Sequence, residues 1–566
     1  MYLGINAFFH DSGAALIDKD GRIIAAVQEE RFSHVKKEGR FPLESIKYCL
    51  KKGGISINEL DGIGFGWNPY LLLFQRVLWS NIFSVPASFS TIKENLKKIR
   101  SVWNIPKLLQ EHFDADPQKL RIHYFRHHSC HVASAYYASP FERAAFLSMD
   151  GQGELEAITW GICREGKMVK FGQSYLPHSI GKVYSGTCRF LGFQGAEKDG
   201  TVMALAAFGE PKYLEVYRTI IKPVENKKSL KVHVNKRFFD FGSVAEVVRP
   251  SSFLQKTFGT PPRKFEESVE QIHKDIAASL QKRTEEVIIE LLNRLHAITG
   301  ETNLVLSGGV ALNSVLNGKL EKISPFKNVF IQPAAHDAGL SLGAAYRLRA
   351  LDQPQAKTHV PMTTAALGPE FTEEDYRMAL DEAKLTYTKL NNLAQEVAKL
   401  IDAGKVIAWF QGRMEFGPRA LGSRSLLGDA RRADMTGLLN KVKHREKFRP
   451  FAISILEGKS PLILENITHS PFMLMIDTVK LEWRDKLPSA QHVDKSVRIQ
   501  TVTKERDGLY YDLIKAFDEL TGTPLIINTS LNVKGQPIVC SPKEAIRTFV
   551  ESEIDILVLG SYIVKK

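Results

Sequence analysis

An internal repeat constrains the fold of this chain more than any other feature. Residues 2–30 and 145–175 each alternate an apolar strand, a polar loop, a second strand, a short turn with glycine and a third strand. The loop reads HDSG in the first copy and DGQGE in the second, and the turns read KDG and REG. The repeat predicts a duplicated domain whose two halves open with the same hairpin. Two unrelated hairpins, which are common in proteins, are the alternative interpretation.

Two further turns from strand to helix follow the second copy. Residues 303–320 run from an apolar strand through Gly308 and Gly309 into a helix, and residues 329–348 run from a strand through a His-Asp pair into a helix of small residues. Backbone amides at a helix N-terminus bind the phosphates of an adenine nucleotide, and short Gly, Asp and Ser loops suit a metal-bound nucleotide. A duplicated α/β fold with one such loop per half is the pattern of the actin-like ATPase superfamily. The strand that begins the segment 329–348 places Asp337 at its end, where ligand-binding and catalytic sites are built in α/β folds.

The stretch HHSCHVASAYYASP, residues 127–140, carries two histidines at the head of an alanine-rich segment that reads as helical. Residues four apart lie on one helix face, so His127 and His131 can bind one ion. His128 and Cys130 lie between them on other faces. An isolated HxxxH pair more often packs against its own helix, so a metal site requires further ligands.

Composition limits the class of protein without choosing a function. The 566 residues are 44% hydrophobic and 25% charged, as in soluble globular proteins with several domains. The formal net charge of +13 admits nucleic acid, an anionic surface or phosphorylated small molecules as partners. Five cysteines without CxxC spacing indicate a reducing compartment, by default the cytoplasm, and residues 1–13 do not read as a signal peptide.

The apolar stretch 68–89 is interrupted by Gln75, Arg76 and Asn81 well short of a membrane-spanning length. Its apolar residues recur at helical spacing, which predicts a helix that packs on a core. A partner or substrate surface is the alternative. We therefore expect no membrane association, and the stretch makes a homodimer reasonable.

Residues 349–371 contain prolines and lose apolar periodicity, which marks a domain boundary. We expect an N-terminal domain over 1–355, a linker over 356–370 and a smaller α/β domain over 371–566. Within the last, residues 405–432 predict a strand followed by a loop rich in glycine and arginine. Guanidinium groups bind phosphate oxygens in pairs, so the loop predicts an oxyanion site, with a salt-bridged surface as the alternative. Its arginines are Arg413, Arg419, Arg424, Arg431 and Arg432.

Several long motifs, in this order, resemble those of the O-carbamoyltransferases of the NodU/CmcH type, which act on nodulation factors and cephamycins. The resemblance covers nearly the whole chain. It implies an N-terminal domain with the fold of the tRNA threonylcarbamoyl transferases and a YrdC-like C-terminal domain. The motifs are HxxxH at 127–131, MDGQGE at 149–154, LSGGVALN at 306–313, PAAHDAG at 333–339, FGPRALGSRSLL at 416–427, NKVKHREKFRPFA at 440–452 and INTSLNVKGQPIV at 527–539.

The resemblance implies the chemistry of the N-terminal domain. A divalent metal, with Fe²⁺ as the first candidate, would be bound by His127, His131, Asp150 and Asp337. Mg²⁺ is a further candidate cofactor, to which no residues are assigned. His10 matches the general base of the family and Lys36 a position that contacts the acceptor. The implied nucleotide-binding residues are Asp150, Gly151, Gly153, Gly181, Gly308, Gly309 and Asn313.

The resemblance also implies that the C-terminal domain converts carbamoyl phosphate and ATP into carbamoyl adenylate, whose carbamoyl group is then transferred to a hydroxyl of a small molecule or sugar. The implied carbamoyl phosphate pocket consists of Arg419, Arg424, Lys443, Arg449, Arg498, Asn528 and Ser530. One departure affects the nucleotide contacts, because Thr201 stands where the family has a lysine, with Lys198 nearby.

Two other classes of function were weighed. A tRNA-modifying or RNA-binding protein would need a basic stripe with stacking aromatics, and no arginine-rich tract lies outside the pocket motifs, so no nucleic acid partner is expected. An HxxxH metallopeptidase would need an acid such as the Glu of HExxH, and residues 127–131 read HHSCH. The identity of the acceptor is not predicted.

Overall fold

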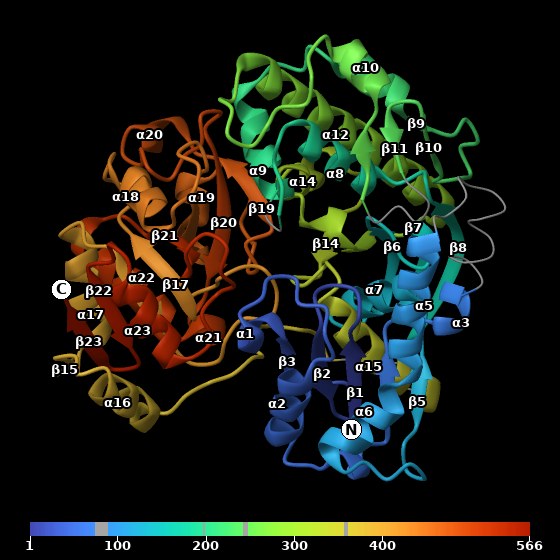
Figure 1. Cartoon of the computed structure of the whole chain (residues 1–566). Coiled ribbons are helices and arrows are strands. Elements are labelled where there is room, and N and C mark those ends of the chain that lie inside the picture. The colour runs from blue at the N-terminus through green and yellow to red at the C-terminus, as the bar shows by residue number, and fades with distance from the viewer. Residues whose placement is uncertain (74–88, 196–197, 242–246, 356–359) are drawn as a thin grey trace. The chain divides into compact units, whose positions relative to one another are not determined.

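The computed structural model of the chain describes residues 1–73, 89–195, 198–241, 247–355 and 360–566 (Figure 1). Its contacts divide the chain into two units. The N-terminal unit comprises residues 1–29, 37–313 and 320–362, and the C-terminal unit comprises residues 30–36, 314–319 and 363–566. Two short segments from the first part of the sequence therefore fold with the C-terminal unit, which the sequence did not indicate.

The N-terminal unit contains two five-stranded sheets of the same topology. In the first, the strand order is β3-β2-β1-β4-β5, and in the second it is β8-β7-β6-β13-β14. In each sheet the opening three strands pair antiparallel and the last two add parallel to the first of them. This identity of order and direction confirms the predicted duplication. The strands are β1 (Tyr2–Asn6), β2 (Gly13–Ile17), β3 (Ile23–Gln28), β4 (Gly62–Phe65), β5 (Ile122–Tyr124), β6 (Arg143–Met149), β7 (Glu156–Arg164), β8 (Lys167–Tyr175), β13 (Asn303–Ser307) and β14 (Asn328–Ile331).

Two helices carry site residues and pack closely on each other. The helix α15 (Gly339–Asp352) packs against α7 (His127–Tyr136) and against β1. A Cβ at Gly343 would lie 1.9 Å from the carbonyl oxygen of Cys130, so a glycine is needed where the two helices meet. The run of small residues that follows the His-Asp pair therefore brings Asp337, just before α15, close to the histidines of α7.

The remaining helices of the N-terminal unit surround these sheets, and two short two-stranded sheets complete it. The helices are α2 (Leu43–Gly53), α3 (Pro69–Leu72), α5 (Phe89–Trp103), α6 (Ile105–Phe113), α8 (Ile180–Phe190), α9 (Lys198–Leu205), α10 (Leu214–Ile220), α11 (Ser252–Phe258), α12 (Gln271–Thr299) and α14 (Leu320–Ile323). The short strands are β9 (Ile221–Pro223), β10 (Val232–Val234), β11 (Phe239–Asp240) and β12 (Arg249–Pro250).

The C-terminal unit is built on a nine-stranded mixed sheet in the order β15-β23-β22-β16-β17-β21-β18-β20-β19. Its core lies where α17 (Leu393–Asp402) and α22 (Leu509–Thr521) pack on the sheet through buried Leu, Ile, Val and Phe side chains. It is the smaller α/β domain that the sequence predicts. The strands are β15 (Thr388–Lys389), β16 (Ile407–Phe410), β17 (Arg424–Gly428), β18 (Ala452–Leu456), β19 (Met475–Thr478), β20 (Ser496–Val502), β21 (Leu525–Ser530), β22 (Ile556–Leu559) and β23 (Tyr562–Lys565).

Two helices of the C-terminal unit, the first two of the following set, come from the segments 30–36 and 314–319. The helices of this unit are α1 (Glu30–Ser33), α13 (Ser314–Asn317), α16 (Glu373–Glu382), α17 (Leu393–Asp402), α18 (Met435–Val442), α19 (Ser460–Ile463), α20 (Leu481–Arg484), α21 (Lys504–Asp507), α22 (Leu509–Thr521) and α23 (Pro542–Val550).

Three further predictions from sequence concern the stretch 68–89, membrane-spanning helices and the cysteines. The stretch 68–89 begins as the helix α3, and residues 74–88 lie outside the described residues. Within the described ranges, no helix combines the length and apolarity needed to cross a membrane. All five cysteines are buried and free.

Candidate functional site

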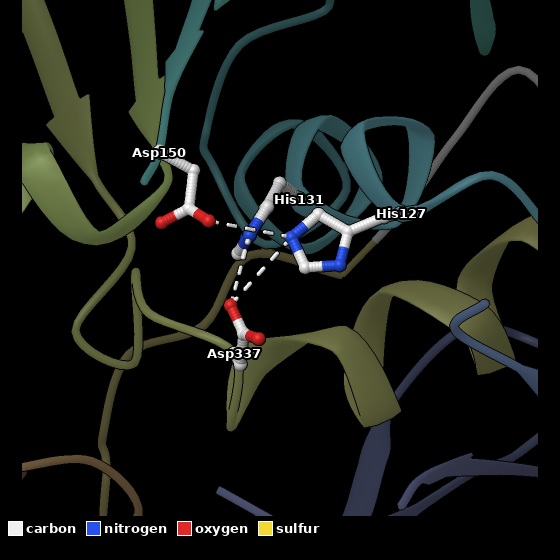
Figure 2. Close-up of side chains that lie close together, drawn as sticks. All are labelled: His127, His131, Asp150 and Asp337. Carbon is white, nitrogen blue, oxygen red and sulfur yellow. Dashed lines mark ion pairs between the residues drawn. The ribbon is translucent and has the colours of Figure 1, made fainter. Parts of the chain in front are cut away.

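Four side chains of the N-terminal unit converge on one point (Figure 2). The helix α7 supplies His127 and His131, Asp150 follows β6, and Asp337 lies in the turn before α15. The Nε2 atom of His127 lies 3.6 Å from Asp150 Oδ2 and 3.6 Å from Asp337 Oδ1, and His131 Nε2 lies 3.5 Å from Asp337 Oδ1. All four residues are buried, and one ligand atom from each lies within 4.8 Å of the others. The structure thus brings together the four residues that the sequence nominates as metal ligands.

These atoms fit a divalent cation. Both ring nitrogens of His127 and His131 and both oxygens of Asp337 are buried without a hydrogen-bond partner among the described residues, although buried polar atoms are normally paired. Ligand atoms about 3.5 Å apart can surround an ion at roughly 2.1 Å, the usual distance for nitrogen and oxygen ligands. Burial lowers the pKa of His127, which favours the neutral ring that a metal binds. Imidazole and carboxylate together suit Fe²⁺, Mn²⁺ or Zn²⁺.

Backbone amides from two loops fix the orientation of Asp150. The N–H of Gly309 donates to its Oδ1 at 2.9 Å, and the N–H of Gln152 donates to its Oδ2 at 3.2 Å. Gly308 has a φ of +84°, and a Cβ there would lie 2.2 Å from the carbonyl oxygen of Met149. Burial works to raise the pKa of Asp150, but the histidines that face it hold this pKa well below its usual range. The GG motif therefore brings an amide against a metal-facing carboxylate.

Two more of the predicted nucleotide-binding glycines border Asp150. A Cβ at Gly181, in the first turn of α8, would lie 3.2 Å from the Asp150 carbonyl oxygen and 3.2 Å from Gly151 N. The side chain of Ser179, which caps this helix, donates to Gly151 O at 2.8 Å and accepts from Lys182 N at 3.1 Å. The N-terminus of α8 therefore lies directly against the Asp150 loop, next to the candidate ion site.

Gly153 and Asn313 have other surroundings. A Cβ at Gly153 would lie 2.9 Å from His128 Cδ2, so this glycine allows the loop to pack on the first turn of α7. The side-chain amide of Asn313 exchanges hydrogen bonds of 3.0 and 3.2 Å with that of Gln281 on α12. These contacts favour structural roles for both residues, and their nucleotide contacts stay predictions.

Glu154 caps α7, the helix that carries two of the candidate metal ligands, and was not singled out from the sequence. Its side chain is fully buried, and its two oxygens accept the N–H of His127 at 3.1 and 3.2 Å. One of them also accepts the N–H of Asn68 at 3.0 Å. Burial, together with the neighbouring Glu156, raises the pKa of Glu154 to about 7. Because no side chain of α7 caps its own N-terminus, Glu154 sets the position of the first metal ligand.

We expect Glu154→Ala to weaken metal binding about 10-fold to 100-fold, the range for residues that orient a metal ligand. Loss of the cap should also cost about 1 kcal/mol of stability. Glu154→Gln keeps one acceptor oxygen and should have a smaller effect. Competition with a chelator of known affinity measures the change, with the exposed turn variant Glu165→Ala as the control. Equal affinities in Glu154→Ala and the control would contradict the role assigned to Glu154.

His10 lies beside the candidate metal site. Its Nδ1 is 2.9 Å from Asp11 Oδ2 and 3.5 Å from Asp337 Oδ2, and 52% of its side chain is exposed. The buried Asn6 amide donates to the carbonyl oxygens of His10, Asp11 and Asp337 at 2.9 to 3.1 Å, and so ties the two loops together. Partial burial works to lower the pKa of His10, but Asp337 and Asp11 outweigh it and raise this pKa to about 9. Asn6 is a second positioning residue that the sequence did not reveal.

In the C-terminal unit, a cluster of arginines surrounds Arg498 on β20. Burial and the nearby charges of Arg419, Arg445 and Arg449 lower the pKa of Arg498 well below its usual range. Within the described part of the chain, no carboxylate pairs with Arg498, and its buried Nε has no hydrogen bond. Like charges held together in this way require an anion to offset their repulsion. Three of these arginines were predicted from sequence, and Arg445 was missed.

The sheet beneath this cluster holds the loop that carries Arg419. Asn528 on β21 and Arg498 on β20 both pair in register with Ala452, so their side chains lie on the same face. The Asn528 amide donates to the carbonyl oxygen of Ala420 at 3.3 Å, and the Gln500 amide donates to that of Leu421 at 2.8 Å. Asn528 is fully buried. It therefore supports the arginine loop, and its contact with the carbamoyl group stays a prediction.

Two predicted pocket residues are engaged with the protein itself. The buried guanidinium of Arg424 donates to the carbonyl oxygens of Gln411, Ser423, Pro369 and Gly412 at 2.7 to 3.1 Å and stacks 3.6 Å above the Phe410 ring. The buried Lys443 ammonium donates to four oxygens, which are the backbone carbonyl and the side-chain oxygen of Ser530 and of Asn532. These contacts favour a structural role for Arg424 and a role for Lys443 in shaping the turn that holds Ser530.

The other arginines of the loop contact the protein itself, and Arg413 donates to the carbonyl oxygens of Leu367 at 2.6 Å and Gly368 at 3.4 Å. Arg431 pairs with Asp429 at 2.7 Å and with Asp402 at 2.5 Å, and Arg432 pairs with Asp434 at 2.8 Å. These two belong to a salt-bridged surface. Lys36 lies in the segment 30–36, whose contacts group it with the C-terminal unit; its contact with an acceptor stays a prediction.

Both units match one family of enzymes. Residues 1–346 match the family described as carbamoyltransferase N-terminus, and residues 398–566 match carbamoyltransferase C-terminus. The chain belongs to the carbamoyltransferase family. This confirms the resemblance drawn from the motifs, and it makes the protein a carbamoyltransferase enzyme.

Relatives of this carbamoyltransferase align over most of its length. An uncharacterized protein of Synechocystis sp. is 38% identical over 100% of this chain and 96% of that protein. Nodulation protein NolNO of Sinorhizobium fredii is 33% identical over 99% of this chain and 80% of that protein, and nodulation protein NolO of Bradyrhizobium diazoefficiens is 35% identical over 78% of each. Among solved structures, component A of the Acidaminococcus fermentans (R)-2-hydroxyglutaryl-CoA dehydratase has a TM-score of 0.33 at 16% identity, covering 62% of this chain and 98% of that one.

Proposed function

We propose that this carbamoyltransferase makes carbamoyl adenylate from carbamoyl phosphate and ATP and transfers the carbamoyl group to a hydroxyl of a small molecule or sugar. The observation that carries the proposal is the burial of Arg498 among Arg419, Arg445 and Arg449, with no carboxylate paired to Arg498 itself among the described residues. Phosphorylated substrates supply the missing negative charge. We assign activation to the predicted domain 371–566 and transfer to the domain 1–355.

In the first reaction, the oxygen that links the carbamoyl carbon to phosphorus must stay on the carbamoyl group while carbamoyl phosphate is converted into the adenylate. Water takes the phosphoryl group of carbamoyl phosphate and releases inorganic phosphate, and the carbamate that remains displaces pyrophosphate from the α-phosphorus of ATP. Charge accumulates on phosphate oxygens at both stages, so guanidinium groups fixed in advance lower both barriers. Arg419, Arg449 and Arg498 are the proposed phosphate ligands, and Ser530 is proposed to address the carbamoyl group.

In the second reaction, the acceptor oxygen attacks the carbamoyl carbon and AMP departs. His10 is the proposed base: Asp11 engages its Nδ1, which leaves Nε2 to take the proton of the hydroxyl. Half of the His10 side chain is exposed, so an acceptor can reach it. When bound, the metal would draw the charge of Asp337 away from His10 and supply positive charge for the phosphate oxygens of AMP.

The nucleotide is proposed to occupy the loop that holds Asp150, where Gly151, Gly181, Gly308 and Gly309 bring backbone close together. Fe²⁺ is the proposed metal. The names of two relatives connect them with nodulation, and they do not identify the acceptor of this chain. A homodimer also remains a proposal, which light scattering of the purified protein tests.

The direct test incubates the protein with carbamoyl phosphate, ATP and a panel of hydroxylated metabolites and sugars. We expect pyrophosphate release that depends on carbamoyl phosphate, and mass spectrometry should find one product that carries a single added carbamoyl group. Reactions without ATP are the control. Release of pyrophosphate at the same rate without carbamoyl phosphate would contradict the proposed activation step.

A further inference from the structure

The segment 30–36, which we call the strap, leaves the N-terminal unit and folds with the C-terminal unit. Both of its ends are fixed in the N-terminal unit by one residue. The N–H of Glu29 donates to the carbonyl oxygen of Ser12 at 2.8 Å, and the N–H of Ser12 donates to that of Glu38 at 2.8 Å. Because its ends are held, the strap loses little conformational entropy when it packs with the other segments of the C-terminal unit.

Arg31 is the most deeply buried residue of the strap, with 2% of its surface exposed against 8% for Glu30. One terminal nitrogen donates to the carbonyl oxygen of Gly417 at 2.7 Å, and the other lies 3.1 Å from Glu30. The next residue, Phe32, packs on a small core of Met414, Ile538 and Cys540. A buried guanidinium is costly unless it is paired, so these partners fix where Arg31 can lie.

The bond from Arg31 reaches the loop that carries Arg419. Gly417, whose φ is +117°, lies two residues before that arginine. The far side of the loop is held by Glu415, whose Oε1 accepts the N–H groups of Leu421, Ser423 and Arg424 at 2.7 to 3.2 Å. Arg31 therefore binds the near side of the loop from 386 residues away in sequence.

We propose that Arg31 is a positioning residue for the carbamoyl phosphate site: it holds the Gly417 turn so that Arg419 faces Arg498. The assignment of a substrate to that site rests on the proposed function. A charged donor to a carbonyl oxygen is among the stronger hydrogen bonds, and replacing Arg31 removes that donor from the Gly417 carbonyl and its positive charge from beside Glu30. The activation reaction of the C-terminal unit thus depends on a residue from the first 36 of the chain.

The test compares the full chain carrying Arg31→Met, which keeps the apolar stem, with Arg31→Lys, which keeps the charge. Arg484→Met is the matched control, because Arg484 also donates to a carbonyl oxygen of the C-terminal unit, that of Val479 at 2.9 Å, and lies outside the arginine cluster. The first readout is hydrogen exchange of peptides that cover 416–424. We expect faster exchange there in Arg31→Met, an intermediate rate in Arg31→Lys and the wild-type rate in the control.

The second readout is pyrophosphate release against carbamoyl phosphate concentration. We expect KM for carbamoyl phosphate to rise about 10-fold to 100-fold in Arg31→Met, the range for losing a charge-assisted hydrogen bond, with a smaller rise in Arg31→Lys and none in Arg484→Met. Should Arg31→Met fail to fold, Arg31→Lys carries both readouts.

The outcomes separate this proposal from the proposed function. Unchanged exchange of 416–424 in the Arg31 variants, or an equal rise of KM in the control, overturns the role of Arg31. If the wild-type chain releases no pyrophosphate with carbamoyl phosphate, the proposed function fails, and the exchange of the loop still decides whether Arg31 positions it.

Discussion

His127→Ala and His131→Ala are each expected to lose the divalent ion that the purified wild-type chain should carry at about one per chain. Each variant removes one of four convergent candidate ligands and leaves a single histidine of α7 beside Asp337. Loss of a ligand should exceed the 10-fold to 100-fold effect of removing a residue that only orients one. Elemental analysis after gel filtration measures the content, and transfer activity should disappear with the ion.

His128→Ala is the matched control for this experiment. It lies on the same helix between the two ligands, but its Nε2 is 3.0 Å from the carbonyl oxygen of Glu156, on the other side. This variant should keep the ion. If both His127→Ala and His131→Ala retain it at wild-type content, the metal assignment is wrong.

Arg498→Met is expected to abolish activation while leaving the fold intact. The variant removes a guanidinium that three other arginines oppose, so the melting temperature should stay at or above that of the wild type. A guanidinium can make two charge-assisted bonds to a phosphate, each worth roughly 1.5–3 kcal/mol, so pyrophosphate release should fall at least about 100-fold. Carbamoyl phosphate should also raise the melting temperature of the wild type more than that of the variant.

Thermal unfolding and the pyrophosphate assay, run on the same preparations, provide both measurements. Arg484→Met again serves as the control, with unchanged activity expected. A large fall of the melting temperature in Arg498→Met, with activity lost in proportion to the unfolded fraction, would contradict a substrate role and indicate a structural one.

The sequence predicted those parts of the fold that are local and repeated. The two hairpin copies predict the duplicated sheets because strand, loop and turn alternate over short stretches of sequence. His127 and His131 share a helix, so their spacing alone places them on one face. Asp150 and Asp337 joined them only through the family resemblance, because no local pattern tells which strand ends meet.

The sequence did not indicate contacts that depend on packing between distant segments. Glu154 caps α7 from another loop, and Asn6 ties His10 to Asp337 through three carbonyl oxygens. Both are ordinary polar residues at strand ends, with no signal beyond their place beside a motif. The strap is a clearer case, because Arg31 directly follows the first hairpin copy in sequence and yet bonds to Gly417.

The arginine loop illustrates the same limit within a single motif. Arg419 and Arg424 lie five residues apart in one Gly-rich run, and composition treats them alike. In the structure, Arg424 turns inward to four carbonyl oxygens, whereas Arg419 joins the charged cluster. The direction in which each side chain points separates the structural role of Arg424 from the proposed phosphate-binding role of Arg419. The sheet beneath the loop sets that direction.

The central claim is that one chain contains two reactions in series, and chemically prepared carbamoyl adenylate tests it most directly. Supplied with the acceptor found in the mass screen, it should restore carbamoylated product in Arg498→Ala and Arg449→Ala, because these variants lack only activation. It should fail to restore product in His10→Ala and His127→Ala, which lack transfer. Rescue of all four variants, or of none, would contradict two sites in series.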